Sequence, residues 1–152
     1  MTSHGKIDQS LPSDGRLLGM DLGERRIGLA LSDPSQTVAQ PLVTLTRRSG
    51  KRFPLAELRT HLEVHMPVGI VIGLPYDASG TENERTTAAR KTGQLVASRT
   101  GLPVEFWDER MTTARVLRTI KELGGKVRGR KKEVDALAAT VILQTFLESR
   151  RQ

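Results

Sequence analysis

A chain of 152 residues is long enough to form one domain with a single hydrophobic core, without help from disulfide bonds. Hydrophobic residues make up 37% and charged residues 27%, as in soluble globular proteins, and no apolar run is long enough to cross a bilayer. The chain has no cysteine, so disulfides and thiolate metal sites are excluded, in keeping with a reducing cytoplasm. The net charge of +7 favours a polyanionic partner, and nucleic acid is the first candidate.

Residues 1–15 are polar and contain no apolar core of a secretion signal. We therefore expect a disordered leader over residues 1–15 and one folded domain over residues 16–149. Without a signal or a membrane span, the expected location is the cytoplasm.

Three strands are expected in the first third of the chain. Residues 16–20 and 27–31 are apolar runs on either side of a turn that begins at Asp21, a pattern typical of a hairpin. Residues 38–46 follow as a third run. The short connections predict an antiparallel meander.

The middle of the chain predicts a helix and a buried strand. Leucines recur at helical spacing from Leu55 to Leu62, which predicts a helix over residues 54–64. Residues 68–72 are apolar at every position, as in a central strand that is covered on both faces. A parallel crossover is therefore expected.

The last half predicts three helices and one strand. A Thr-x-x-Glu pattern at Thr81 resembles a capping box and would begin a helix that ends near Arg99. A strand over residues 104–107, a helix capped by Thr112 or Thr113, and a helix over residues 133–149 complete the order. This order predicts an α/β fold with a mixed five-stranded sheet, three antiparallel strands and then two parallel ones, and helices on both faces.

Asp21 and Asp135 are the first two candidates for a functional site. Asp21 lies between Gly19 and Gly23, whose small size lets another group approach, although an Asp that caps a turn is an equally good interpretation. Asp135 shares a helical face with Ala138, Ala139, Ile142 and Phe146, so it should point inward. Because a buried carboxylate is costly without a cation, a metal ion is its natural partner.

The adjacent acids Asp108 and Glu109 follow the last strand. Strand alternation does not choose between them, because they point to opposite faces, and Arg110 could pair with either. A surface ion pair explains these residues as well as catalysis does.

Several segments together resemble the YqgF/RuvX family, in the family's order over nearly all of residues 16–148. They are Gly19-Met20-Asp21-Leu22-Gly23 with Arg26-Ile27-Gly28, Gly73-Leu74-Pro75, Asp108-Glu109-Arg110-Met111-Thr112-Thr113, Val134-Asp135-Ala136-Leu137-Ala138-Ala139, and Ile142-Leu143-Gln144. Members of the family have a ribonuclease H-like fold and are described as nucleases of pre-16S ribosomal RNA and as Holliday junction resolvases.

The resemblance implies a hydrolase that cleaves phosphodiester bonds. By motif, Asp21, Glu109 and Asp135 are the catalytic acids and hold Mg²⁺ or Mn²⁺, while Asp108 and Arg110 support them. Two such ions could clamp a scissile phosphate and activate water. The implied reaction is processing of the 5′ end of pre-16S ribosomal RNA, with cleavage of four-way DNA junctions as the alternative.

Other polar residues receive weaker interpretations. The segment after Pro75 differs from the sequence that is commonest in the family, so no role is assigned to Asp77. The histidines lie away from the acids in the sequence and are interpreted as surface or structural residues: His4, His61 and His65.

Basic residues near the acids would contact phosphates. Those expected to bind nucleic acid are Arg25, Arg26, Arg128, Arg130, Lys131 and Lys132, and residues 47–52 form a further basic loop. Aromatic residues are only 3%, so recognition of backbone shape is favoured over base stacking. The expected partners are pre-ribosomal RNA, or branched DNA, and a ribosomal particle. No membrane partner is expected, and the chain should be a monomer or a weak homodimer.

Two rival interpretations of the sequence remain. The Gly-Met-Asp-Leu-Gly segment also resembles the first phosphate loop of actin-like ATPases and sugar kinases, but those proteins need two such domains and this chain has room for one. A non-catalytic module that binds nucleic acid or ribosomes could retain the fold. A binder, however, has no need of a carboxylate cluster that repels phosphate.

Overall fold

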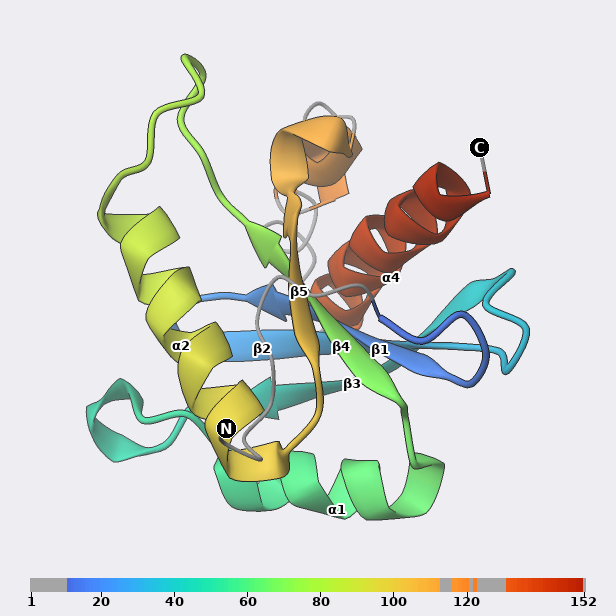
Figure 1. Ribbon diagram of the computed structural model, residues 1–152. Helices are drawn as coiled ribbons and strands as arrows, with labels where there is room; N and C mark the ends of the chain where they lie inside the picture. Colours follow the sequence, from blue (N-terminus) through green and yellow to red (C-terminus); the bar gives the residue numbers. More distant parts are fainter. Residues whose placement is uncertain (1–10, 113–115, 121, 123–130, 152) are drawn as a thin grey trace.

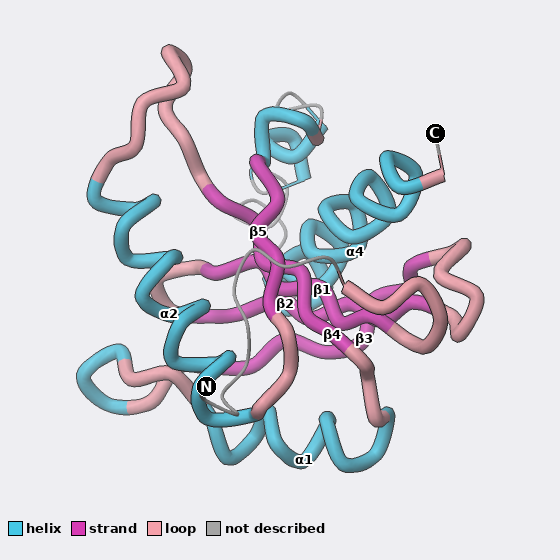
Figure 2. Tube along the Cα trace, viewed as in Figure 1, coloured by secondary structure: helices cyan, strands magenta, loops and turns pink. Residues whose placement is uncertain are grey.

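A computed structural model describes residues 11–112, 116–120, 122 and 131–151. Its strands form one sheet in the order β3-β2-β1-β4-β5, with helices on both faces (Figure 1, Figure 2). The strands are β1 (Leu17–Leu22), β2 (Arg26–Ser32), β3 (Ala39–Thr46), β4 (Gly69–Leu74) and β5 (Val104–Asp108). The α-helices are α1 (Leu55–His65), α2 (Glu84–Thr100) and α4 (Lys131–Arg150), and the 3₁₀ helices are η1 (Ser49–Lys51) and η2 (Glu109–Met111).

The sheet confirms the predicted mixed topology. β2 pairs antiparallel with β1 and β3, whereas β4 pairs parallel with β1 and β5. One detail differs from the prediction, because β1 continues through Asp21 instead of turning there. Asp21 pairs with Gly28 and Leu22 with Ile27, so the hairpin turn contains only residues 23–25.

Alternation along the strands divides the core into two layers. Leu18 and Met20 of β1 pack towards α1 and α2, together with Ile72 of β4. Leu17 and Val71 point the other way and pack against α4. Figure 1 shows α1 and α2 on one side of the sheet and α4 on the other. No helix in the described part of the chain is both long and apolar enough to cross a membrane.

Helix α2 begins two residues later than a cap at Thr81 would place it. The Asn83 side chain accepts hydrogen bonds from the backbone N–H groups of Arg85 and Thr86, and the Thr86 hydroxyl accepts from the N–H of Asn83. The capping box is therefore Asn83 with Thr86, and the predicted box at Thr81 is wrong. Asn caps as well as Ser or Thr, and its reciprocal partner is already in place here.

The ends of the described domain also differ from the expected boundaries. Leu11 is only 4% exposed, so packing begins before residue 16, and Arg150 donates hydrogen bonds to the carbonyls of Leu11 and Pro12 and to the side chain of Gln36. Residues 1–10 of the expected leader lie outside the described residues. Helix α4 begins at Lys131, two residues before the predicted start.

The predicted third helix is described only in part. Residues 116–120 are helical, whereas Thr113 lies outside the described residues. The other candidate cap, Thr112, is fully buried, and its hydroxyl accepts a hydrogen bond from the Trp107 indole N–H.

Among the described glycines, Gly28 has the tightest surroundings. A Cβ on Gly28 would overlap the backbone carbonyl of Asp135, whereas a Cβ on Gly93 of α2 would meet side chains, chiefly the ring of Phe106. We expect Gly28→Ala to destabilise the protein by about 1–3 kcal/mol, because α4 as a whole must move. Gly93→Ala should cost less, because an alanine favours the helix and a side chain such as Phe106 can shift more easily than a backbone carbonyl. Denaturant unfolding of both variants measures the difference, and equal stabilities would contradict the assigned contact.

Candidate active site

Three neighbouring strands place Asp21 between two glycines. Asp21 pairs with Gly28 of β2. On its other side, β1 pairs with β4 up to Met20 and Ile72, so Gly73 is the next residue of β4 in the same register. All three residues face α4, because Gly28 and Gly73 both approach residues of that helix. Asp21 is 5% exposed. Because glycine has no side chain, Gly28 and Gly73 leave space on either side of the Asp21 carboxylate for other groups.

The other two acids predicted by motif fill these spaces. A Cβ on Gly73 would lie 2.9 Å from Oε1 of Glu109, so the Glu109 side chain extends over β4 beside Asp21. The backbone of Asp135 lies directly over Gly28 on the other side. Residues far apart in the sequence therefore meet around one glycine-flanked carboxylate.

The structure distinguishes between the adjacent acids Asp108 and Glu109. Trp107 packs against Phe146 of α4, so by alternation Asp108 faces the opposite side of the sheet. Glu109 follows in η2 and turns back over Gly73. Of this pair, only Glu109 lies beside Asp21.

Asp108 instead forms an ion pair with Arg110. The guanidinium donates to both carboxylate oxygens, with Nη2 at 2.6 Å from Oδ2, and the Arg110 backbone N–H also donates to Oδ1. Partial burial raises the pKa of the Asp108 carboxyl, but the hydrogen bonds from Arg110 outweigh it and hold the pKa below its usual value. Asp108 therefore fixes the position of Arg110 next to Glu109.

Arg110 in turn supports the loop after β4. Its guanidinium lies 5.0 Å from the ring centroid of Tyr76 and approaches Gly80 closely. Within this loop, the Asp77 carboxylate accepts hydrogen bonds from the Ser79 hydroxyl and the Thr81 N–H, and these bonds lower its pKa. The structure thus gives Asp77 a role in shaping the loop.

Asp135 has a partner within the protein. Arg26 of β2 donates from Nε to Oδ2 at 2.6 Å, and the two side chains are 29% and 23% exposed. The helical face of Asp135 is buried as expected, since Ala138, Ala139 and Ile142 are fully buried. The cation that faces Asp135 is a guanidinium. Within the described ranges, no three acidic or histidine side chains are close enough together to form a ready-made metal site.

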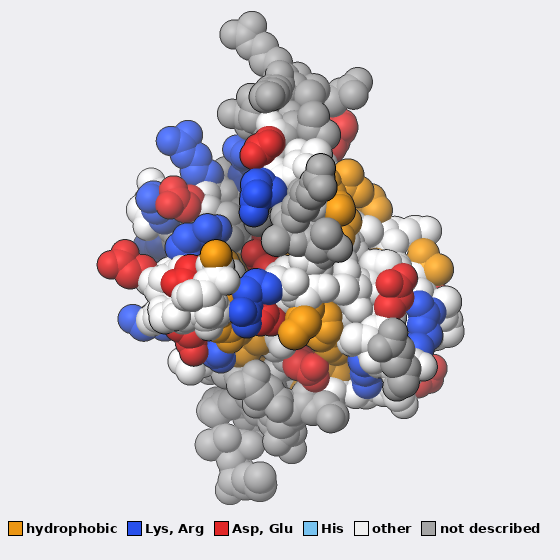
Figure 3. All heavy atoms as spheres, turned by 90° about the horizontal axis from the view of Figure 1, so that it is seen from above, with side chains coloured by type: hydrophobic (Ala, Val, Ile, Leu, Met, Phe, Trp, Pro, Cys, Tyr) orange, Lys and Arg blue, Asp and Glu red, His pale blue; other side chains and the backbone are white. Residues whose placement is uncertain are grey.

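The basic residues expected to bind nucleic acid lie in different places, and some of them are outside the described residues. Arg25 is exposed in the β1–β2 turn, and Arg26 is engaged with Asp135. Arg128 and Arg130 lie outside the described residues, while Lys131 and Lys132 open α4, one turn before Asp135. Figure 3, which views the molecule from above, shows Lys and Arg side chains interspersed with acidic ones on the side of α2.

The histidines lie away from the acids. His61 and His65 stack on α1 with ring centroids 6.4 Å apart, and α1 packs on the sheet face opposite α4. His4 lies outside the described residues.

Some residues of the site were not identified from the sequence. Gly28 and Gly73 belong to the family motifs, but only the paired strands reveal that they make room for Asp135 and Glu109. Their matching parity on neighbouring strands was the available signal. Arg85 and Arg118 were also missed, although with Glu109 they line a cavity of about 380 Å³.

Comparison with known proteins identifies the family to which this chain is similar. A family model described as "RuvX: Holliday junction resolvase" matches residues 15–149. Among similar curated proteins, one from Koribacter versatilis is 43% identical over 136 residues, which covers 90% of this chain and 88% of the relative. One from Paramagnetospirillum magneticum is 41% identical over 142 residues, covering 93% and 90%. Both carry the name "Putative pre-16S rRNA nuclease".

Solved structures show the same fold. RuvC from T. thermophilus, in complex with a Holliday junction substrate, superposes with a TM-score of 0.55 at 16% identity, covering 90% of this chain and 96% of that chain. A second Thermus thermophilus RuvC structure gives 0.51 at 14% identity, with the same coverage. The ribonuclease H-like fold is therefore confirmed. Since the family model spans the domain and the relatives exceed 40% identity over about nine-tenths of the chain, this chain belongs to the RuvX family.

Proposed function

We propose that this chain is a metal-dependent endonuclease that hydrolyses phosphodiester bonds, with the 5′ end of pre-16S ribosomal RNA as its substrate and Asp21, Glu109 and Asp135 as its catalytic acids. The observation that carries the proposal is the row Gly28-Asp21-Gly73, whose two glycines make room for Asp135 and Glu109. A purely structural role for these acids does not require glycine on both sides of Asp21. The names of the similar proteins and of the matching family, which describe nucleases, support the same reaction.

The donor set fits a hard divalent cation. Carboxylate oxygens are the ligands that Mg²⁺ and Mn²⁺ prefer, and the burial of Asp21 makes a cation favourable next to its carboxylate. Asp21 and Glu109 would hold the ion, and Asp135 would join them when its carboxylate turns away from Arg26. An ion held by these carboxylates would serve to activate a water molecule and to stabilise charge on the scissile phosphate.

The chain's own residues position the substrate. Three carboxylates repel a phosphodiester, so nearby cations must hold the neighbouring phosphates. Arg110 is fixed beside Glu109 by its ion pair with Asp108, and Arg26 lies at the opposite end of the site. A phosphate between them would meet a guanidinium on either side. Lys131 and Lys132 extend the positive charge along the start of α4.

Cleavage of branched DNA is the second candidate. The family description and the fold of the junction-bound RuvC favour it, whereas the names of the relatives favour ribosomal RNA. Both reactions use the same acids. We favour RNA, acting in the cytoplasm on RNA carried by a ribosomal particle, because relatives above 40% identity bear that name.

The acids should be individually necessary for cleavage. We expect Asp21→Asn, Glu109→Gln and Asp135→Asn each to abolish cutting, because each replaces an ionised ligand with a neutral amide of the same shape. A labelled ribosomal RNA precursor and a four-way DNA junction, each with Mn²⁺ or EDTA, provide the assay, and circular dichroism checks folding. If all three variants remain fully active, the assignment fails; binding without any cutting by wild type favours the non-catalytic module.

Metal binding should be visible without any substrate. Mn²⁺ that binds only the folded state should raise the Tm of wild type by several degrees at saturation, by mass action. Asp21→Asn should lose this increase. Asp33→Asn is the control, because Asp33 follows β2 at the opposite end of the sheet and accepts hydrogen bonds within its own loop. An equal increase in both variants would place the metal elsewhere.

The start of α4 should contribute to RNA binding through charge. We expect the double variant Lys131→Glu, Lys132→Glu to weaken RNA binding and to flatten its dependence on salt, because fewer counterions are released. Cleavage at saturating RNA should persist, since the acids are unchanged. Titrations at several salt concentrations measure the slope, and an unchanged slope would remove these lysines from the interface.

A further inference from the structure

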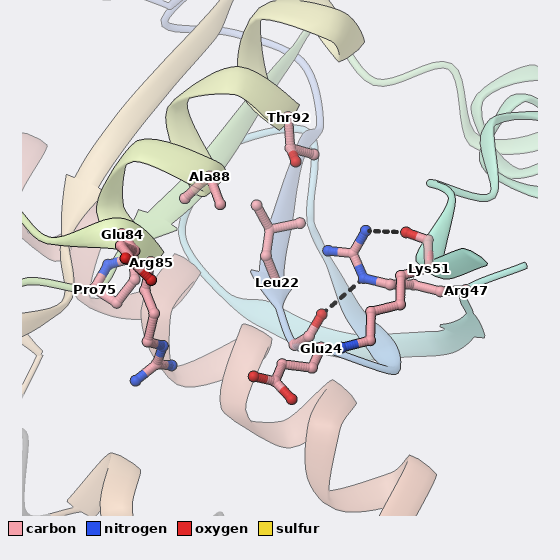
Figure 4. Close-up of a pocket in the computed structure, with 11 residues that line it drawn as sticks. Leu22, Glu24, Arg47, Lys51, Pro75, Glu84, Arg85, Ala88 and Thr92 are labelled. Carbon is pink, nitrogen blue, oxygen red and sulfur yellow. Dashed lines mark hydrogen bonds between the residues drawn. The ribbon is translucent and has the colours of Figure 1, made fainter.

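A second cavity lies on the other face of the sheet, close to the candidate active site. It has a volume of about 310 Å³ and lies between the end of β1, the loop after β3 and the first half of α2. Figure 4 shows Leu22 at its centre, with Ala88 and Thr92 of α2 on one side and Arg47 on the other. We refer to it as the α2 cavity; its lining residues used below are Leu22, Glu24, Arg47, Lys51, Glu84 and Arg85, with Ala88 on α2.

The α2 cavity adjoins the cavity beside Glu109, because Pro75 and Arg85 line both. Leu22 directly follows Asp21 in β1, so the two side chains point to opposite faces of the same strand end. A strand of nucleic acid whose phosphate lies at Asp21 and Glu109 can therefore continue past Arg85 into the α2 cavity.

The topology of the sheet places a crevice at this position. The chain leaves β1 towards β2, whereas it leaves the neighbouring strand β4 through α2 towards β5. The connections depart in opposite directions from the carboxyl ends of adjacent strands, and such points open a crevice that ligands commonly occupy in α/β sheets. Pro75 lies directly after the end of β4.

One wall of the α2 cavity suits a phosphate. Arg47 is held in place because its Nε donates to the Gly23 carbonyl at 2.8 Å and its Nη1 to the Lys51 carbonyl at 3.3 Å. Arg47 is half-buried, and this partial withdrawal from water lowers the pKa of its guanidinium. Lys51 and Arg85 add two further positive charges to the lining. A fixed and partly desolvated guanidinium binds phosphate more strongly than a freely moving one.

The remaining lining suits a base and a ribose. The side chains of Leu22 and Ala88 present an apolar surface for the face of a base. Glu24 and Glu84 are carboxylates that can accept hydrogen bonds from sugar hydroxyls. Ribose offers a 2′-hydroxyl donor that deoxyribose lacks, and this group allows a protein to distinguish RNA from DNA.

We propose that the α2 cavity holds a ribonucleotide of the RNA strand that flanks the cleaved phosphate, with its phosphate at Arg47 and Lys51 and its base against Leu22 and Ala88. This inference rests on the proposed function, because the path of the RNA into the α2 cavity starts from a phosphate bound at Asp21 and Glu109. The binding itself requires no cleavage and can be measured separately.

The test uses a fluorescein-labelled oligouridylate and the full chain in EDTA, with binding measured by fluorescence anisotropy. Ala88→Glu places a negative charge in the cavity from an exposed helical position, and we expect it to weaken binding about tenfold. Ser98→Glu makes the same charge change at an exposed position of α2 about 15 Å further along the helix and should leave the affinity unchanged. Wild type should bind the matching oligodeoxyuridylate more weakly than the RNA.

The outcomes separate this inference from the proposed function. Equal affinity of Ala88→Glu and Ser98→Glu for the RNA overturns the α2 cavity as a binding site, even if wild type cleaves RNA when Mn²⁺ is present. Equal affinity of wild type for the RNA and DNA oligonucleotides overturns the recognition of ribose. Selective loss in Ala88→Glu supports the cavity even if no condition yields cleavage, in which case only the proposed function fails.

Discussion

The second turn of α4 rests directly on the backbone of β2, where Gly28 leaves no side chain between the strand and the carbonyl of Asp135. This contact determines the depth at which α4 packs, and therefore the height of Asp135 above Asp21. It also brings Arg26, two residues before Gly28, within 2.6 Å of the Asp135 carboxylate. A strand with alanine in place of Gly28 would hold α4, and with it Asp135, further away from Asp21.

The ion pair between Arg26 and Asp135 gives this arrangement a stable form without a metal. Half-buried carboxylates next to Asp21 would otherwise repel one another. Both partners are less than one-third exposed, so the pair is partly protected from solvent screening. A cation that binds Asp21 and Glu109 would then compete with Arg26 for Asp135. The released guanidinium would be free to meet a phosphate.

Much of the fold could be predicted from the sequence, because hydrophobic periodicity is a local property. β4 is apolar over its whole length, and β1 and β2 contain the apolar runs 17–20 and 27–31; the five-stranded mixed sheet followed from the order of these runs. The cap of α2 could not be predicted as easily. Thr81 with Glu84 and Asn83 with Thr86 are overlapping candidates, and only the path of the chain from Pro75, whose carbonyl accepts the Thr86 hydroxyl, selects the second. The geometry of the site was also inaccessible, because Arg26 and Asp135 are 109 residues apart and strand alternation left Asp108 and Glu109 equivalent.

Arg150 ties the two ends of the described domain together, through its hydrogen bonds to Leu11, Pro12 and Gln36. Arg150 is fifteen residues along α4 from Asp135, a distance of about 22 Å in a regular helix. The ends therefore meet far from Asp135 and the acids near it. A short linker could join residue 151 to residue 11, and the chain could be opened at an exposed turn, such as between Ser49 and Gly50, to give a circularly permuted protein with the same arrangement of acids.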